Sequence, residues 1–160
     1  MRKDSQGFSW LEIIIVVVVI VLAAGIVIPS LWKSKSDIND VAAVRSIRTI
    51  VLAEKNYSQA YDKGFSPSLS VLGVPPDATP TASLAGFVDS ELAAGAKEGY
   101  TFTYRAGTPD ENGRIQTYSL TVSPTKPGDT GSVYYFVDQT GVIHENTAHP
   151  ATAMDSPFGG

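Results

Sequence analysis

A single carboxylate, Glu12, stands inside an otherwise apolar stretch near the start of the chain. Residues 8–28 contain only Ser9 and Glu12 as hydrophilic positions, and the run from Ile13 to Ile28 is uninterrupted. A carboxylate costs about 2.5–3.5 kcal/mol at the centre of a membrane helix and less near its end. Glu12 is therefore either an interfacial residue that reaches water or a residue with a positive partner at the same depth.

The other residues with chemical potential lie near the C-terminus. His144 and His149 flank Glu145, but five positions separate the two histidines, so they would not share a helix face as zinc-protease ligands do. The sequence shows no phosphate-binding glycine loop and no nucleophile with a companion histidine and acid at a recognisable spacing. The sequence therefore predicts no catalytic residue, no metal ligand and no cofactor. A weaker calcium alternative would use scattered acids that lack a ligand pattern, namely Asp129, Asp138, Glu145 and Asp155.

The composition divides the chain of 160 residues into a regular first part and a turn-rich second part. Residues 1–63 hold 2 of the 14 glycines and 1 of the 10 prolines, whereas residues 64–160 hold the remaining 12 and 9. The absence of cysteine excludes a disulfide scaffold, a thiolate zinc site and a cysteine nucleophile. The net charge of −4 argues against a phosphate-binding face, so we expect no nucleic-acid partner.

The apolar run has the length of a membrane span. A helix over residues 8–28 would be roughly 30 Å long, the thickness of a bilayer's hydrocarbon core. A cleaved signal peptide with a site at Leu22-Ala23-Ala24 is the alternative, but the run continues past these alanines. The flanking Lys and Arg residues are nearly balanced, so charge leaves the orientation open.

Residues 7–12 read Gly-Phe-Ser-Trp-Leu-Glu, directly before the apolar run. This resembles the processing motif of type IV pilins and of type II secretion pseudopilins. The resemblance implies that prepilin peptidase cuts after Gly7 and that Phe8 becomes the N-methylated N-terminus, with Glu12 as the acidic position of the motif. Pro29 matches a helix-kinking proline of the family, whereas Trp10 departs from its usual aliphatic residue.

The resemblance implies a structural subunit of a type IV pilus or type II secretion pseudopilus, and not an enzyme. In such a filament Glu12 of one subunit would neutralise the Phe8 amine of a neighbour. This pairing would offset the free-energy cost of burying both charges. The implied partners are prepilin peptidase, other subunits in a helical homo- or hetero-polymer, the inner-membrane assembly platform and the lipid bilayer. The implied location is the bacterial inner membrane, single-pass with an extracytoplasmic C-terminal domain, and then the filament. The alternative is a single-pass anchor that displays a small extracytoplasmic binding domain.

Two residues predict a kink in the apolar helix. Pro29 has no amide hydrogen to donate to the carbonyl of Gly25, and its ring crowds that turn of the helix. Gly25 is the residue type that resists unwinding of a helix least. The alternative is that Gly25 and Pro29 are merely tolerated, as both residue types often are in membrane helices.

The amphipathic pattern predicts that the helix continues over residues 31–63. Apolar residues recur at steps of three and four from Ile38 to Tyr61, a stripe that also contains Glu54. Gly64 is placed to end the helix as its C′ residue.

The remaining chain predicts a small sheet. Alternating patterns indicate strands at residues 100–104, 115–122, 132–137 and 142–145, and a short helix is expected around 88–94. The predicted fold class is α+β and pilin-like, with a long N-terminal helix and a small antiparallel sheet of three or four strands. The first half of the helix is predicted to be transmembrane, and its second half is predicted to pack on the sheet. The expected organisation is leader 1–7, transmembrane and assembly helix 8–30, amphipathic helix 31–63, connecting loops 64–98, sheet 99–146 and flexible tail 147–160.

Overall fold

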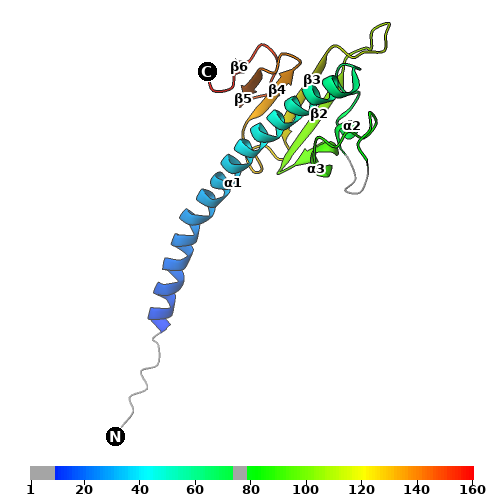
Figure 1. Ribbon diagram of the computed structural model, residues 1–160. Coiled ribbons are helices and arrows are strands. Elements are labelled where there is room, and N and C mark those ends of the chain that lie inside the picture. Colours follow the sequence, from blue (N-terminus) through cyan, green and yellow to red (C-terminus); the bar gives the residue numbers. More distant parts are fainter. Residues whose placement is uncertain (1–9, 74–78) are drawn as a thin grey trace. The chain divides into compact units, whose positions relative to one another are not determined.

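The computed structural model describes residues 10–73 and 79–160, and for residues 23–34 only their helical backbone (Figure 1). The chain forms two compact units, Met1–Ser34 and Lys35–Gly160. We call the second unit the head unit. Helix α1, Trp10–Tyr61, contributes to both units, and all strands belong to the head unit.

The sheet of the head unit is a six-stranded antiparallel meander, in which the spatial order of the strands is the order of the chain. Each strand therefore pairs with its neighbours in sequence, for example Leu120 of β3 with Tyr104 of β2 and with Val137 of β4. The strands are β1 Ala96–Lys97, β2 Tyr100–Ala106, β3 Tyr118–Pro124, β4 Tyr134–Asp138, β5 Ile143–Asn146 and β6 Ser156–Pro157. Two short helices, α2 Leu69–Leu72 and α3 Ser90–Ala93, lie in the segment that connects α1 to the sheet.

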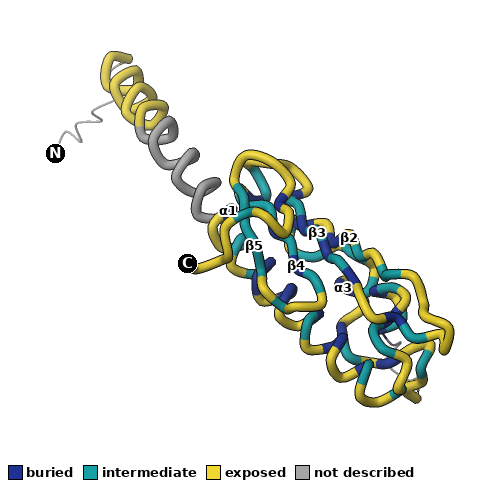
Figure 2. Tube along the Cα trace, turned by 90° about the horizontal axis from the view of Figure 1, so that it is seen from above, coloured by how far each residue is buried: buried dark blue, intermediate teal, exposed yellow. Residues whose placement is uncertain are grey.

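The part of α1 within the head unit packs on one face of the sheet. Its buried stripe repeats at steps of three and four and includes Val44, Ile47 and Ile50. Alternate residues of the strands complete the core, since Leu120, Val122 and Val137 are fully buried while their neighbours in sequence are not. Figure 2 shows these buried positions along β3 and β4 in dark blue. Helix and sheet therefore share one hydrophobic core.

The end of α1 lies slightly before the predicted position. The helix ends at Tyr61, and both Asp62 (φ 52°) and Gly64 (φ 74°) adopt left-handed backbone conformations. Gly64 forms a parallel bridge with Ile115, and the amide of Phe65 donates to the Ile115 carbonyl at 2.8 Å. Gly64 therefore serves less as a helix cap than as the point where the chain leaving the helix meets the β2–β3 connection.

The predicted sheet of three or four strands is wrong, because the sheet has six. The additional strands, β1 and β6, are two residues long, so no alternating pattern can be read from them. Strand β6 pairs with β5, and Ala151 is buried, so the segment expected to be a flexible tail adds the outermost strand of the sheet.

The predicted membrane span is also contradicted. Among the residues whose side chains are described, no helix is long and apolar enough to cross a membrane. This finding overturns the transmembrane first half of the fold prediction and the single-pass inner-membrane location.

Candidate functional site

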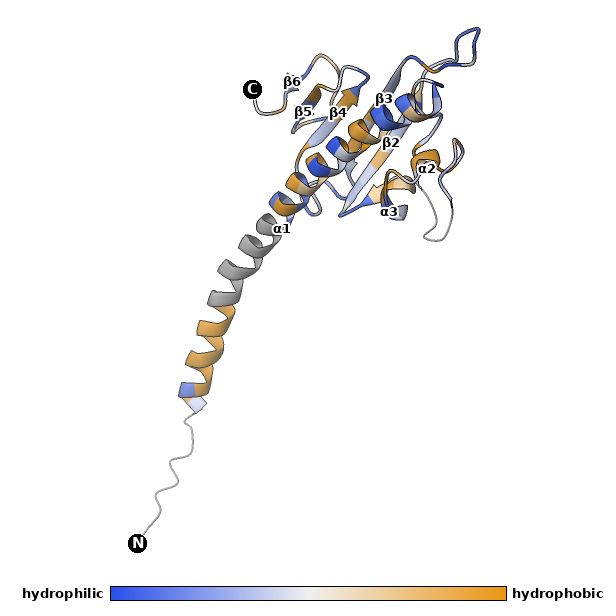
Figure 3. Cartoon of the chain, in the orientation of Figure 1, coloured by the Kyte–Doolittle hydropathy of each residue, from blue (hydrophilic) through white to orange (hydrophobic). Residues whose placement is uncertain are grey.

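The first turns of α1 carry apolar side chains on every side. From Trp10 to Leu22 every large apolar residue is exposed, with exposed fractions between 42% for Ile14 and 78% for Trp10. Figure 3 shows this stretch mostly in orange, and Figure 2 shows it in yellow throughout. We call Trp10–Leu22 the apolar segment. A helix that is apolar all round is stable only when other apolar groups surround it.

Glu12 is the one charged residue of the apolar segment, and it lies in the first turn of α1. A carboxylate there interacts favourably with the partial positive charge of the helix N-terminus. Glu12 is exposed and forms no ion pair with any residue that the structure describes.

The other residues predicted to take part in processing, assembly or the kink are ones whose side chains the structure does not describe. Gly7 and Phe8 lie outside the described residues. Gly25 and Pro29 lie in α1, but in the stretch whose side chains are not described. The predicted cleavage site and the predicted kink therefore stay predictions.

The C-terminal histidines and acids organise loops. Asp155 closes the last loop, because its carboxylate accepts from Asn146 Nδ2 at 2.6 Å and from the Thr152 amide at 2.7 Å. The hydrogen bond from the Asn146 side chain is the main reason that the pKa of Asp155 is lowered. His144 Nδ1 lies 2.7 Å from the Asp155 carbonyl oxygen, and Asp138 accepts from the amide of Thr140 in the β4–β5 turn. Among the described residues, no three His, Asp or Glu side chains converge as metal ligands would.

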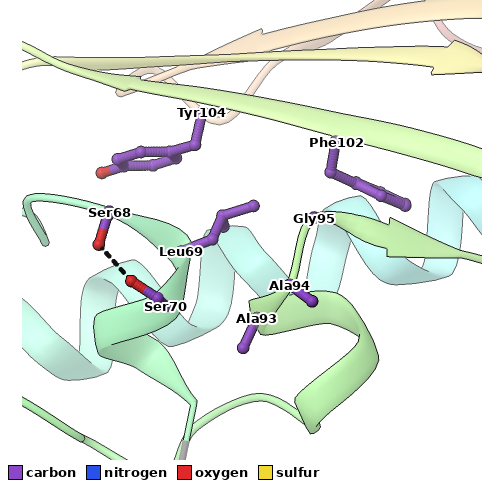
Figure 4. A pocket seen from close by; sticks show the side chains of 8 residues that line it. All are labelled: Ser68, Leu69, Ser70, Ala93, Ala94, Gly95, Phe102 and Tyr104. Carbon is purple, nitrogen blue, oxygen red and sulfur yellow. Dashed lines mark hydrogen bonds between the residues drawn. The ribbon is translucent and has the colours of Figure 1, made fainter.

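A shallow hollow on the head unit lies between α2, the end of α3 and strand β2 (Figure 4). Phe102 and Tyr104 line it from the strand, and Leu69 lines it from α2. Its hydroxyl groups already have partners, since Ser68 and Ser70 bond to each other at 2.8 Å and Tyr104 donates to the Ser66 carbonyl at 2.8 Å. No charged side chain lines the hollow.

Glu54 is a buried polar residue whose environment the sequence did not predict. Its carboxylate is fully buried and accepts from the Ser66 amide at 2.8 Å and from Ser66 Oγ at 2.6 Å. Burial raises the pKa of Glu54, and the two hydrogen bonds from Ser66 oppose the rise. The only sequence signal was the position of Glu54 within the apolar stripe of the helix.

Asp40 is a second polar anchor between α1 and the sheet. Its carboxylate accepts from the Ser132 amide at 3.1 Å and from Ser132 Oγ at 2.7 Å, and the Tyr100 hydroxyl lies 2.5 Å from it. Burial is the largest cause of the raised pKa of Tyr100, followed by the bond to Asp40. Glu54 and Asp40 thus hold α1 to the loops around the sheet, which is a structural role.

Comparison with known proteins assigns the chain to no family. No family model, curated protein or solved structure matches it significantly.

Proposed function

We propose that the chain is a structural subunit of a filament, a pilin or pseudopilin, that assembles through its apolar segment and has no catalytic role. The observation that carries this proposal is the exposure of apolar side chains on all sides of Trp10–Leu22. A bundle of such helices from many copies would bury every side at once, which a single partner face would not do.

Glu12 gives the bundle a register. Cleavage after Gly7, as the motif Gly-Phe-Ser-Trp-Leu-Glu suggests, would place a cationic amine on Phe8, four residues before Glu12. In a bundle the amine of one copy can neutralise Glu12 of the next only at one axial offset. A buried charge pair is a known means of fixing register between helices.

The buried polar residues of the head unit hold its fold together, as the bonds from Ser66 to Glu54 and from Ser132 to Asp40 illustrate. On the resemblance of residues 7–12 to the processing motif, the partners we propose are prepilin peptidase, further copies or related subunits, and the platform that assembles them.

Replacement of Glu12 by leucine tests the proposal. Loss of one half of a buried charge pair costs on the order of 3–5 kcal/mol, and the loss recurs at every subunit contact. We expect Glu12→Leu protein to be processed, with an intact mass that begins at Phe8, but to be missing from the sheared filament fraction. Glu111→Leu, which removes an exposed acid of the head unit, is the matched control and should leave filament yield unchanged.

Two results would contradict the proposal. Filaments at wild-type yield from Glu12→Leu would show that Glu12 has no partner in the assembly. A wild-type protein that keeps residues 1–7 and forms no filament would show that the motif is not a processing site.

A further inference from the structure

The outward face of α1 in the head unit combines exposed apolar and cationic side chains. Three large apolar residues are exposed there, Ile38 at 65%, Val41 at 55% and Leu52 at 59%. Exposed cations follow the same helical spacing of three and four. The outward face, as used below, consists of Ile38, Val41, Arg45, Arg48, Leu52 and Lys55, and the exposed Asp37 lies one turn before Val41 at its start.

The cations of the outward face have no acidic partner within the described part of the chain. The ion pairs found there are Lys97 with Asp89 and Arg114 with Asp62, and neither involves the outward face. Apolar and cationic groups that are both left exposed in one stripe indicate a surface for another molecule.

The rest of the head unit carries the opposite charge. Residues 62–160 contain 5 Lys and Arg against 11 Asp and Glu. Part of this charge gathers where α3 meets β1, the first strand of the sheet. Glu91 and Glu98 are exposed there, while Lys97 is engaged by Asp89 at 2.6 Å. We call Asp89–Glu98 the acidic edge.

We propose that the outward face of one copy docks on the acidic edge of a second copy. The two surfaces are different, so the contact is heterologous. A heterologous contact continues from copy to copy and gives an open filament when the rotation between copies does not close into a ring. The apolar residues would supply the contact area, and Arg45 and Arg48 facing Glu91 and Glu98 would select the partner surface. This contact rests on the proposed filament function and names how neighbouring head units meet.

Cysteine cross-linking of the full chain tests the contact, because the chain has no cysteine of its own. Leu52→Cys marks the outward face, and Ser90→Cys marks the acidic edge. Mixed under filament-forming conditions and oxidised, the two variants should form the mixed dimer in preference to either homodimer. The control is a mixture of Leu52→Cys with Asn112→Cys, since Asn112 is an exposed position on the β2–β3 connection. Its yield of mixed dimer measures the cross-linking that random collision produces.

Charge reversal separates a specific contact from apolar adhesion. Arg45→Glu with Arg48→Glu in the Leu52→Cys chain should lower the mixed-dimer yield about tenfold, since two attractive pairs become repulsive. Glu91→Lys with Glu98→Lys in the Ser90→Cys chain should restore it. The proposal is overturned if the Leu52→Cys homodimer dominates, if the mixed yield equals that with Asn112→Cys, or if reversal on both sides gives no rescue.

The cross-linking result and the filament result are read separately. Filaments without the mixed cross-link would overturn this contact and leave the proposed function in place. The mixed cross-link in a chain that forms no filament would support the contact and overturn the function.

Discussion

At the scale of single residues, Glu54 shows how a buried carboxylate ties stability to pH. Its pKa is raised in the folded protein because burial disfavours the charged form. A raised pKa means that the folded state binds the proton more tightly than the unfolded state does. The stabilising contribution is therefore complete below the unfolded pKa and is lost as the pH rises through the folded one.

Glu54→Gln removes the charge and retains the shape. The amide oxygen can accept from the Ser66 amide, and Ser66 Oγ can turn to donate to the Ser68 carbonyl, which already lies 3.1 Å away. We expect a Tm a few degrees above wild type at pH 7–8, since about 1 kcal/mol shifts Tm by roughly 2–8 °C in domains of this size. The difference should vanish near pH 4.

Thermal melts followed by circular dichroism across this pH range measure the effect. Glu54→Leu is the informative counterpart, because it leaves the Ser66 amide without an acceptor and should destabilise at every pH. A Glu54→Gln protein less stable than wild type at pH 7–8 would show that the charged form is the one that the fold favours.

At the scale of elements, Gly64 decides how α1 joins the sheet. Gly64 and Gly113 have nearly the same left-handed backbone, with φ of 74° and 75°, but different surroundings. A Cβ atom at Gly64 would collide with the backbone carbonyl of Ile115, whereas one at Gly113 would meet nothing within 4 Å. The pair separates the cost of the backbone conformation from the cost of close approach.

Gly113→Ala should cost about 1–2 kcal/mol, the usual strain of a left-handed alanine. Gly64→Ala should cost about 3 kcal/mol or more, because displacement of a packed backbone adds a further 1–3 kcal/mol to the same strain. Urea unfolding of the two variants provides the comparison. Equal losses in the free energy of unfolding would mean that the backbone bridge between Gly64 and Ile115 shifts freely.

Elements could be predicted from the sequence where they were long enough to show a period. The stripe indicated the buried face of α1 from Val44 onward, but its first two residues, Ile38 and Val41, are exposed. The alternation at residues 100–104 and 115–122 indicated β2 and β3. Strands β1 and β6 and helix α2 were missed, because two to four residues carry no readable period. The partner of Glu54 could not be predicted, since only the fold brings the loop at Ser66 back to the helix.

At the scale of the whole molecule, the hydrophobic core lies in the head unit. Its buried residues run from Ala43 to Val137, and none of the residues described in the first unit, Trp10 to Leu22, is among them. We therefore expect the fragment 35–160 to fold alone, with mixed helix and strand circular dichroism and one cooperative melt. The fragment 62–160 is the matched control, because without α1 the apolar face of its sheet is uncovered, and it should show no cooperative transition. A coil spectrum for 35–160 would contradict the expectation.

The prediction for the first unit was weakest where it relied on hydropathy alone. Counting apolar residues from Phe8 to Ile28 gave the length of a membrane span, but among the residues whose side chains are described no helix is long and apolar enough to cross a membrane. The chemical signal was more local. Glu12 stands out because it is the only charge of an apolar segment, and this does not depend on the length of the run.

The meander order of the strands has a consequence for the speed of folding. Each strand reaches its partner through a local connection, from two residues between β1 and β2 to eleven between β2 and β3, so loop-closure entropy at each step is small. Docking of α1 is different, since the bond between Asp40 and Ser132 joins residues 92 positions apart. Contacts of such sequence separation form slowly. We therefore expect docking of the helix to limit the folding rate, so that substitutions at Asp40 slow folding more than substitutions in the β4–β5 turn.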